Sequence, residues 1–292
     1  MIEIRNLEKS YGKQKVIRSF DLTIPSGRVY GMVGVNGAGK STILRLLAGV
    51  LKADSGDIFY DGQPIYENEG IKKQLFFLPD EPYYGGNTTG KQLAELYKTY
   101  YPFDSELFHK WCDAFSLNAA APIHNFSKGM KRQMFVSLAL ASRPKYLLLD
   151  EAFDGLDPNA RLLFKRALID LSEDNGCTTV IASHSLRELS DICTDFALIE
   201  QGSVLQSGDL LGHLEAIHKY QAAFNKEVTR ADFPFDCIKF ECTGRVAQFI
   251  VRGNADSLRE KIEKLQPLFC EEIPVDFEEY FLIETEKGRE NR

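Results

Sequence analysis

The sequence lacks any apolar run long enough for a membrane-spanning helix. Its longest apolar stretches, at residues 134–141 and 147–149, fall well short of the roughly 18 to 20 residues that such a helix needs. The first five residues also lack the basic segment and following apolar segment of a secretory signal. We therefore expect neither a membrane span nor export of this chain.

Closely spaced cysteine pairs are absent as well. The chain contains no Cys-x-x-Cys motif, and Cys237 and Cys242 have no matching second pair that would complete a thiolate metal site. Free thiols in a reducing cytosol are the expected state of the six cysteines.

An excess of positive charge is also lacking. Lys and Arg number 35 against 42 Asp and Glu, which gives a formal net charge of -7. Because sequence-independent binding to nucleic acid depends on a basic surface, we expect no nucleic-acid partner. Hydrophobic residues make up 44% of the 292 positions, enough for one full domain and a smaller one.

Strand and helix patterns alternate through most of the chain. Short apolar runs that end at turn residues predict strands at residues 2–4, 16–24, 29–33, 58–60, 75–78, 146–149, 178–182 and 196–199. Apolar residues at helical spacing predict a helical insert at about 87–140. This alternation indicates an α/β fold with a mixed, largely parallel sheet. We expect a first domain at 1–217 and a small α+β domain at 218–292.

One segment carries the pattern G-x-x-x-x-G-K-[ST] of a phosphate-binding loop, between an expected strand and an expected helix. Glycines let backbone N–H groups curl around a phosphate, and the following helix adds its positive end. Lys40 should reach the β- and γ-phosphates, and Ser41 should hold Mg²⁺. The expected ATP-binding residues here are Gly34, Asn36, Gly37, Ala38, Gly39, Lys40, Ser41 and Thr42.

Two carboxylates follow the apolar strand at 146–149. Ligands of α/β sheets bind at the carboxyl ends of the strands, so Asp150 and Glu151 should lie beside the phosphate loop. Asp150 suits Mg²⁺, directly or through water, and Glu151 suits a general base for the attacking water. Together with the phosphate loop, this pair indicates a P-loop nucleotide hydrolase.

The segment at residues 126–133, Phe-Ser-Lys-Gly-Met-Lys-Arg-Gln, resembles the signature of ABC ATPases in its S-K-G-M form. Residues 155–157, Gly-Leu-Asp, resemble the D-loop of that family. His184 and Tyr11 stand where the family has its switch histidine and the aromatic residue that stacks on adenine. The resemblance covers residues 1–217, with the motifs in the family's order.

The resemblance implies a dimer, homomeric or heteromeric, in which Ser127 and Gly129 of one subunit face the γ-phosphate held by the other. Asp157 would belong to the same nucleotide site, with Glu151, His184 and Lys40 as the catalytic residues. It also implies ATP hydrolysis that drives a separate permease, at the cytoplasmic face of the membrane. The S-K-G-M form favours an ABC-2 type exporter of peptides, antibiotics or lipids. The alternatives are a soluble ABC ATPase that acts on ribosomes or DNA, a regulatory module without turnover, and a small P-loop kinase.

Two parts of the sequence depart from the family pattern. Asp80 stands where a glutamine usually touches Mg²⁺ and the attacking water. Its carboxylate would offer Mg²⁺ a hard oxygen, or else would cap a turn before Pro82 and face solvent. In the signature, Lys128 and Met130 stand where glycine and glutamine are commoner. Lys128 either assists a phosphate electrostatically or is a solvated lysine.

Overall fold

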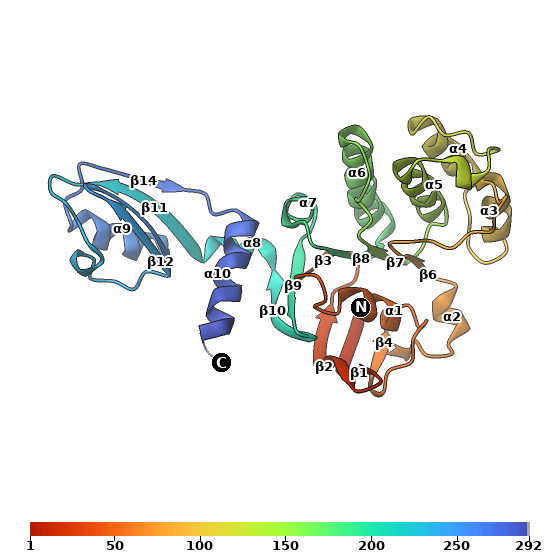
Figure 1. Cartoon of the computed structure of the whole chain (residues 1–292), viewed down its shortest axis with the longest axis horizontal. Helices are drawn as coiled ribbons and strands as arrows, with labels where there is room; N and C mark the ends of the chain where they lie inside the picture. Colours follow the sequence, from red (N-terminus) through yellow and green to blue (C-terminus); the bar gives the residue numbers. More distant parts are fainter. Residues whose placement is uncertain (291–292) are drawn as a thin grey trace. The chain divides into compact units, whose positions relative to one another are not determined.

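The computed structural model describes the backbone of residues 1–290 and the side chains of residues 1–285 (Figure 1). The chain divides into two compact units, Met1–Ser207 and Gly208–Arg292. The boundary expected from the sequence, between residues 217 and 218, lies within the second unit, at the start of strand β11 (Ile217–Ala223). The division falls earlier because β11 is the central partner of β13 and β14 in the second unit's sheet.

A six-stranded sheet forms the centre of the first unit. Its order is β10 (Ser203–Asp209), β9 (Asp195–Glu200), β3 (Val29–Val33), β8 (Thr178–Ser183), β7 (Tyr146–Asp150) and β6 (Leu75–Leu78). β3 runs parallel to β8 and β9, and β7 runs parallel to β6 and β8. Every residue of β3, β7 and β8 is buried, which explains why these strands are continuous apolar runs. Their carboxyl ends meet at one edge, where the candidate site lies.

A separate antiparallel sheet packs against one face of this centre. It has the order β2 (Gln14–Ile24), β1 (Ile2–Tyr11), β4 (Ser55–Tyr60) and β5 (Gln63–Pro64). Helix α1 (Lys40–Leu47) contributes Leu44 and Leu47 to the core that includes residues of both sheets. Figure 1 shows α1 and the antiparallel sheet on one side of the six-stranded sheet and the longer helices on the other. The sequence prediction of α/β architecture is confirmed, with the antiparallel strands as a layer of their own.

Most of the remaining helices of the first unit begin at a side-chain cap. They are α2 (Glu69–Lys72), α3 (Gly90–Tyr97), α4 (Ser105–Ala114), a 3-10 turn (Ile123–Asn125), α5 (Lys128–Ala141), α6 (Pro158–Asn175) and α7 (Leu186–Ser190). Ser127 caps α5 by accepting a bond from the Met130 N–H, and Asp157 caps α6 ahead of Pro158. α3, α4 and α5 occupy the region of the expected helical insert.

The second unit is a four-stranded antiparallel sheet with an aromatic core. Its order is β12 (Lys239–Thr243), β13 (Val246–Arg252), β11 and β14 (Phe269–Ile273), and it also contains α8 (Leu210–Glu215), a 3-10 turn (Arg230–Asp232), α9 (Ala255–Glu263) and α10 (Phe277–Glu290). Phe233 and Phe249 lie 5.0 Å apart between ring centres, and Leu258 of α9 packs in the same cluster. Among the described residues of both units, no helix has the length and apolar character to cross a membrane.

Candidate functional site

A hollow of about 360 Å³ opens at the carboxyl ends of β3 and β7. Its walls are Val16, Asn36, Gly37, Ala38, Gly39, Lys40, Ser41, Thr42, Asp80 and Glu151. The structure therefore brings most of the expected phosphate loop together with one of the two strand-end carboxylates and with Asp80. Val16 was not predicted, because it reaches the hollow from β2, and its place there depends on the packing of a different sheet.

The phosphate loop uses its glycines at two demanding positions. Gly39 is the N-cap of α1 with a φ of 106°, a left-handed conformation that residues with a side chain rarely adopt. Gly34 lies against β9, and a Cβ atom added there would be 2.4 Å from the Ile199 carbonyl oxygen. The loop therefore takes its shape partly from the close approach of a strand far away in the sequence.

Gly34→Ala is expected to lower the free energy of unfolding by about 2 kcal/mol, because the backbone of β9 must move to admit the methyl group. Denaturant unfolding without nucleotide measures this. Gly86→Ala is the matched control, since a Cβ there meets no atom within 4 Å. Equal unfolding midpoints for the two variants would contradict the close approach of Gly34 to β9.

Lys40 extends back along the loop that carries it. Its Nζ donates to the Gly34 carbonyl oxygen at 2.6 Å and to that of Val35 at 3.4 Å. Burial lowers the pKa of Lys40, while the nearby charges of Glu151 and Asp150 act in the opposite direction. The ammonium group thus lies in the loop where phosphate oxygens would be bound, with two carboxylates near it.

A hydrogen bond joins two of the three residues expected to hold a metal, Ser41 and Asp150. Ser41 Oγ donates to Asp150 Oδ1 at 3.1 Å. Burial raises the pKa of Asp150, and the charges of Glu151 and Asp80 raise it further, while the Ser41 bond lowers it. A hydroxyl group and crowded carboxylates are the hard oxygen donors that Mg²⁺ prefers, so these residues fit that ion.

Glu151 and His184 form a hydrogen-bonded pair. His184 Nδ1 lies 2.9 Å from Glu151 Oε2, and Glu151 has a φ of 45°, a strained value for a residue with a side chain. Asp154 is the neighbour that the sequence analysis missed: one ligand atom from each of these three residues lies within 4.8 Å of the other two. Asp154 reaches them through the turn after β7, in which its N–H bonds the Glu151 carbonyl oxygen.

A second cluster, outside the hollow, contains three of the expected ATP-binding residues, Ser127, Gly129 and Asp157. Ser127 Oγ accepts from the Met130 N–H at 3.2 Å, and Asp157 accepts from the N–H groups of Asn159 and Ala160 as the cap of α6. A Cβ on Gly129 would lie 2.5 Å from the Gly155 carbonyl oxygen, so the signature and the D-loop are in direct contact.

Tyr11 is the expected nucleotide contact with the least support. It ends β1 with 46% of its surface exposed and does not line the hollow.

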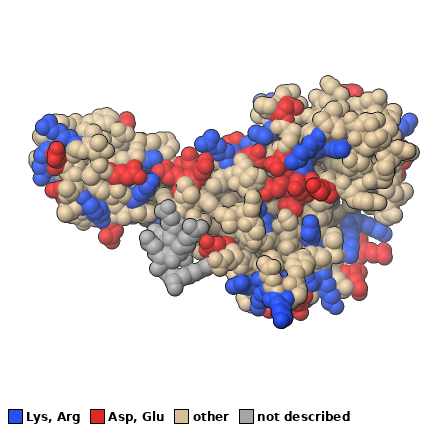
Figure 2. All heavy atoms as spheres, in the orientation of Figure 1, with Lys and Arg blue, Asp and Glu red and all other residues tan. Residues whose placement is uncertain are grey.

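Charged side chains gather on the face of the first unit drawn in Figure 2, with acidic groups in a band beside basic ones.

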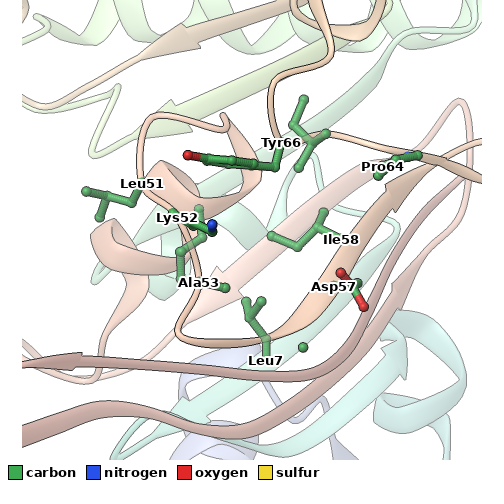
Figure 3. Close-up of a pocket in the computed structure, with 11 residues that line it drawn as sticks. Leu7, Leu51, Lys52, Ala53, Asp57, Ile58, Pro64 and Tyr66 are labelled. Atoms are coloured by element: carbon green, nitrogen blue, oxygen red, sulfur yellow. The ribbon is translucent and has the colours of Figure 1, made fainter.

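A separate pocket of about 140 Å³ lies between β1, β4 and the segment after α1 (Figure 3). Leu7, Ile58 and Leu51 form its apolar walls, and Lys52 lies over the ring of Tyr66 at 4.9 Å. None of the candidate site residues lines this pocket, so the chemistry belongs to the hollow at the phosphate loop.

The comparisons with known proteins agree with this geometry. A family model described as ABC transporter matches residues 17–154. The chain is 29% identical to the ABC transporter ATP-binding protein YtrB of Bacillus subtilis, over 97% of both chains. It is 30% identical to the lantibiotic transport ATP-binding protein SrtF of Streptococcus pyogenes, over 77% of this chain and 99% of that one.

Solved structures show the same fold. A dimeric bacterial ABC transporter cassette, MJ0796, superposes with a TM-score of 0.65 at 21% identity, over 72% of this chain and 99% of that one. The similarity to SrtF along nearly its whole length, together with the phosphate loop and its carboxylates, establishes the family. The chain belongs to the ABC transporter family, as one of its ATP-binding and ATP-hydrolysing subunits.

Proposed function

We propose that this chain powers export of a small peptide, antibiotic or lipid through a separate permease, bound at the cytoplasmic face of the membrane. The hollow that combines Lys40, Ser41 and Glu151 is the observation that carries ATP hydrolysis. Export rests on relatives: SrtF is named for lantibiotic transport, and one relative that is 29% identical is named a Nod factor export ATP-binding protein. Because these relatives are named for transport, the proposal excludes the alternative of a soluble ABC ATPase that acts on ribosomes or DNA.

Each candidate residue has a role in this proposal. The loop N–H groups and Lys40 bind the β- and γ-phosphates, and Ser41, Asp150 and Asp80 supply oxygen atoms to Mg²⁺. When bound, Mg²⁺ neutralises charge on the phosphate oxygens. Glu151 accepts a proton from the attacking water, and His184 holds the Glu151 carboxylate in position through their 2.9 Å hydrogen bond.

The signature cluster supports a dimer of ATPase subunits. Ser127 and Gly129 do not line their own chain's hollow, yet the N–H groups at the start of α5 suit a phosphate. We propose that they contact ATP bound to the other subunit, with Asp157 fixing the start of the neighbouring α6.

The function is tested by co-expression with a multi-span membrane protein, if a neighbouring reading frame encodes one. The two proteins should purify as one complex, and the complex should hydrolyse ATP. Size-exclusion chromatography with ATP should show a dimer of the isolated chain. Absence of ATP hydrolysis by the complex would contradict the proposal, and a chain that remains monomeric with ATP would contradict a site shared between two copies of this chain.

Asp80→Ala should raise the Mg²⁺ concentration needed for half-maximal ATP hydrolysis by about fivefold, because one oxygen donor is lost, while Mg²⁺-free nucleotide binding stays close to normal. Asp80→Gln should restore much of the activity, because its amide oxygen can still face the metal. Asp57→Ala, on β4 and away from the hollow, is the control. Superimposable Mg²⁺ titrations of wild type and Asp80→Ala would leave Asp80 without a metal role.

A further inference from the structure

Asp80 lies between two hollows of the first unit. It lines the phosphate-loop hollow with Ser41 and Glu151, and it also lines a second hollow of about 410 Å³ with Lys131 and Arg132 of α5. Its side chain is 50% exposed, and its charge contributes to the raised pKa of Asp150. The carboxylate is therefore close to both the expected metal edge and the helix that follows the signature.

Arg132 holds the segment that carries Asp80. Its side chain is 3% exposed, and its Nη1 donates to the Pro79 carbonyl oxygen at 3.1 Å. Nη2 donates to both the carbonyl oxygen and Oδ1 of Asp80, each at 2.8 Å. One buried guanidinium group thus fixes the backbone and the carboxylate of the same loop.

The charges around Asp80 make this contact dependent on a cation. Without one, the carboxylates of Asp150 and Asp80 repel each other, and Arg132 attracts that of Asp80. A divalent cation at Ser41 and Asp150 reverses the sign of that edge and attracts the same carboxylate. Arg132 resists the transfer, because a buried guanidinium group that loses its partner carries a large desolvation cost.

We propose that Arg132 is a positioning residue. It holds the Asp80 carboxylate when no metal is bound and releases it to nucleotide-bound Mg²⁺. The inference rests on the proposed metal role of Asp80. Such an exchange would couple two ATP sites. Asp80 belongs to the metal edge of the ATP site in its own subunit, and the first turn of α5 carries the signature that we propose contacts ATP bound to the other subunit. A glutamine at position 80 would carry no negative charge to attract either the Arg132 guanidinium group or Mg²⁺. The proposed exchange therefore depends on the aspartate.

Hydrogen–deuterium exchange of the wild-type chain tests this without any substitution. With a non-hydrolysable ATP analogue and no Mg²⁺, the contact with Arg132 should keep amide exchange at residues 79–84 slow. Addition of Mg²⁺ should raise the exchange rate there by about threefold or more. Exchange in α9, which belongs to the second unit, should not change. Unaltered exchange at 79–84 on addition of Mg²⁺ would overturn the proposal.

Substitutions provide a second readout, the binding of a fluorescent ATP analogue at a series of free Mg²⁺ concentrations. Arg132→Lys keeps the charge but not the three hydrogen bonds, so half-saturation should need about threefold less Mg²⁺, whereas Asp80→Ala should need about fivefold more. In the double variant, Arg132→Lys should have no further effect. Asp191→Asn removes the comparable Lys165 pair and should match wild type.

The outcomes separate the inference from the proposed function. Additive effects of the two substitutions, or an unchanged Mg²⁺ requirement in Arg132→Lys, would overturn the exchange even if the wild-type complex hydrolyses ATP. Should Arg132→Lys fail to fold, the exchange measurement on the wild-type chain decides. Loss of ATP hydrolysis by the wild-type complex would instead contradict the proposed function itself.

Discussion

Glu151→Gln is expected to slow ATP hydrolysis by about 10²- to 10⁴-fold, because the amide cannot accept the proton of the attacking water. The substitution keeps the size of the side chain and a hydrogen-bond acceptor for His184, whose Nδ1 lies 2.9 Å from the carboxylate. ATP affinity should stay close to that of the wild type. The measurement is phosphate release under saturating ATP, beside equilibrium binding of a fluorescent ATP analogue.

The same variant should accumulate as an ATP-bound dimer, because ATP that is not hydrolysed continues to join the two subunits. Size-exclusion chromatography with Mg²⁺ and ATP should show this shift. Glu173→Gln, an exposed position on α6, is the control and should behave as wild type. Near-normal turnover of Glu151→Gln would show that another group accepts the proton.

Lys40→Ala is expected to weaken ATP binding by at least about tenfold and to lower turnover by about 10²-fold or more, because the charge beside the β- and γ-phosphates is removed. Lys40 is buried and bonds only the carbonyl oxygens of Gly34 and Val35 among the described contacts. The variant should therefore fold, with a thermal unfolding midpoint within a few degrees of wild type.

Equilibrium binding of a fluorescent ATP analogue measures the affinity, and phosphate release measures the turnover. Lys73→Ala, an exposed lysine that follows α2, is the charge-matched control. An unchanged ATP dissociation constant in a folded Lys40→Ala variant would contradict the assignment of the phosphate loop.

Features set by neighbouring residues were predictable from the sequence. The phosphate loop is contiguous, so its pattern alone predicted a strand, a glycine turn and a helix, and β3 and α1 flank it in the structure. The caps of α5 and α6 follow from Ser127 and from Asp157 with Pro158, since capping depends on the next two or three residues. The family and its ATP hydrolysis followed from these local motifs and are confirmed by the comparisons.

Features that join distant parts of the chain were decided by the tertiary structure. Periodicity reports which face of a strand is buried but not which strand lies beside it, so the antiparallel sheet could not be separated from the parallel one. For the same reason the approach of Val16 to the hollow was not foreseen.

The sequence by itself determined the class of the protein and the residues of its phosphate loop, because those depend on local backbone geometry and on residue type. It also drew attention to Asp80, but it left two roles open, a metal ligand and a solvent-facing cap. Only packing placed the guanidinium group of Arg132 against that loop, from a helix more than fifty residues later in the chain. An ion pair of this kind depends on where two elements meet in space, and no periodicity or spacing within either element encodes that meeting.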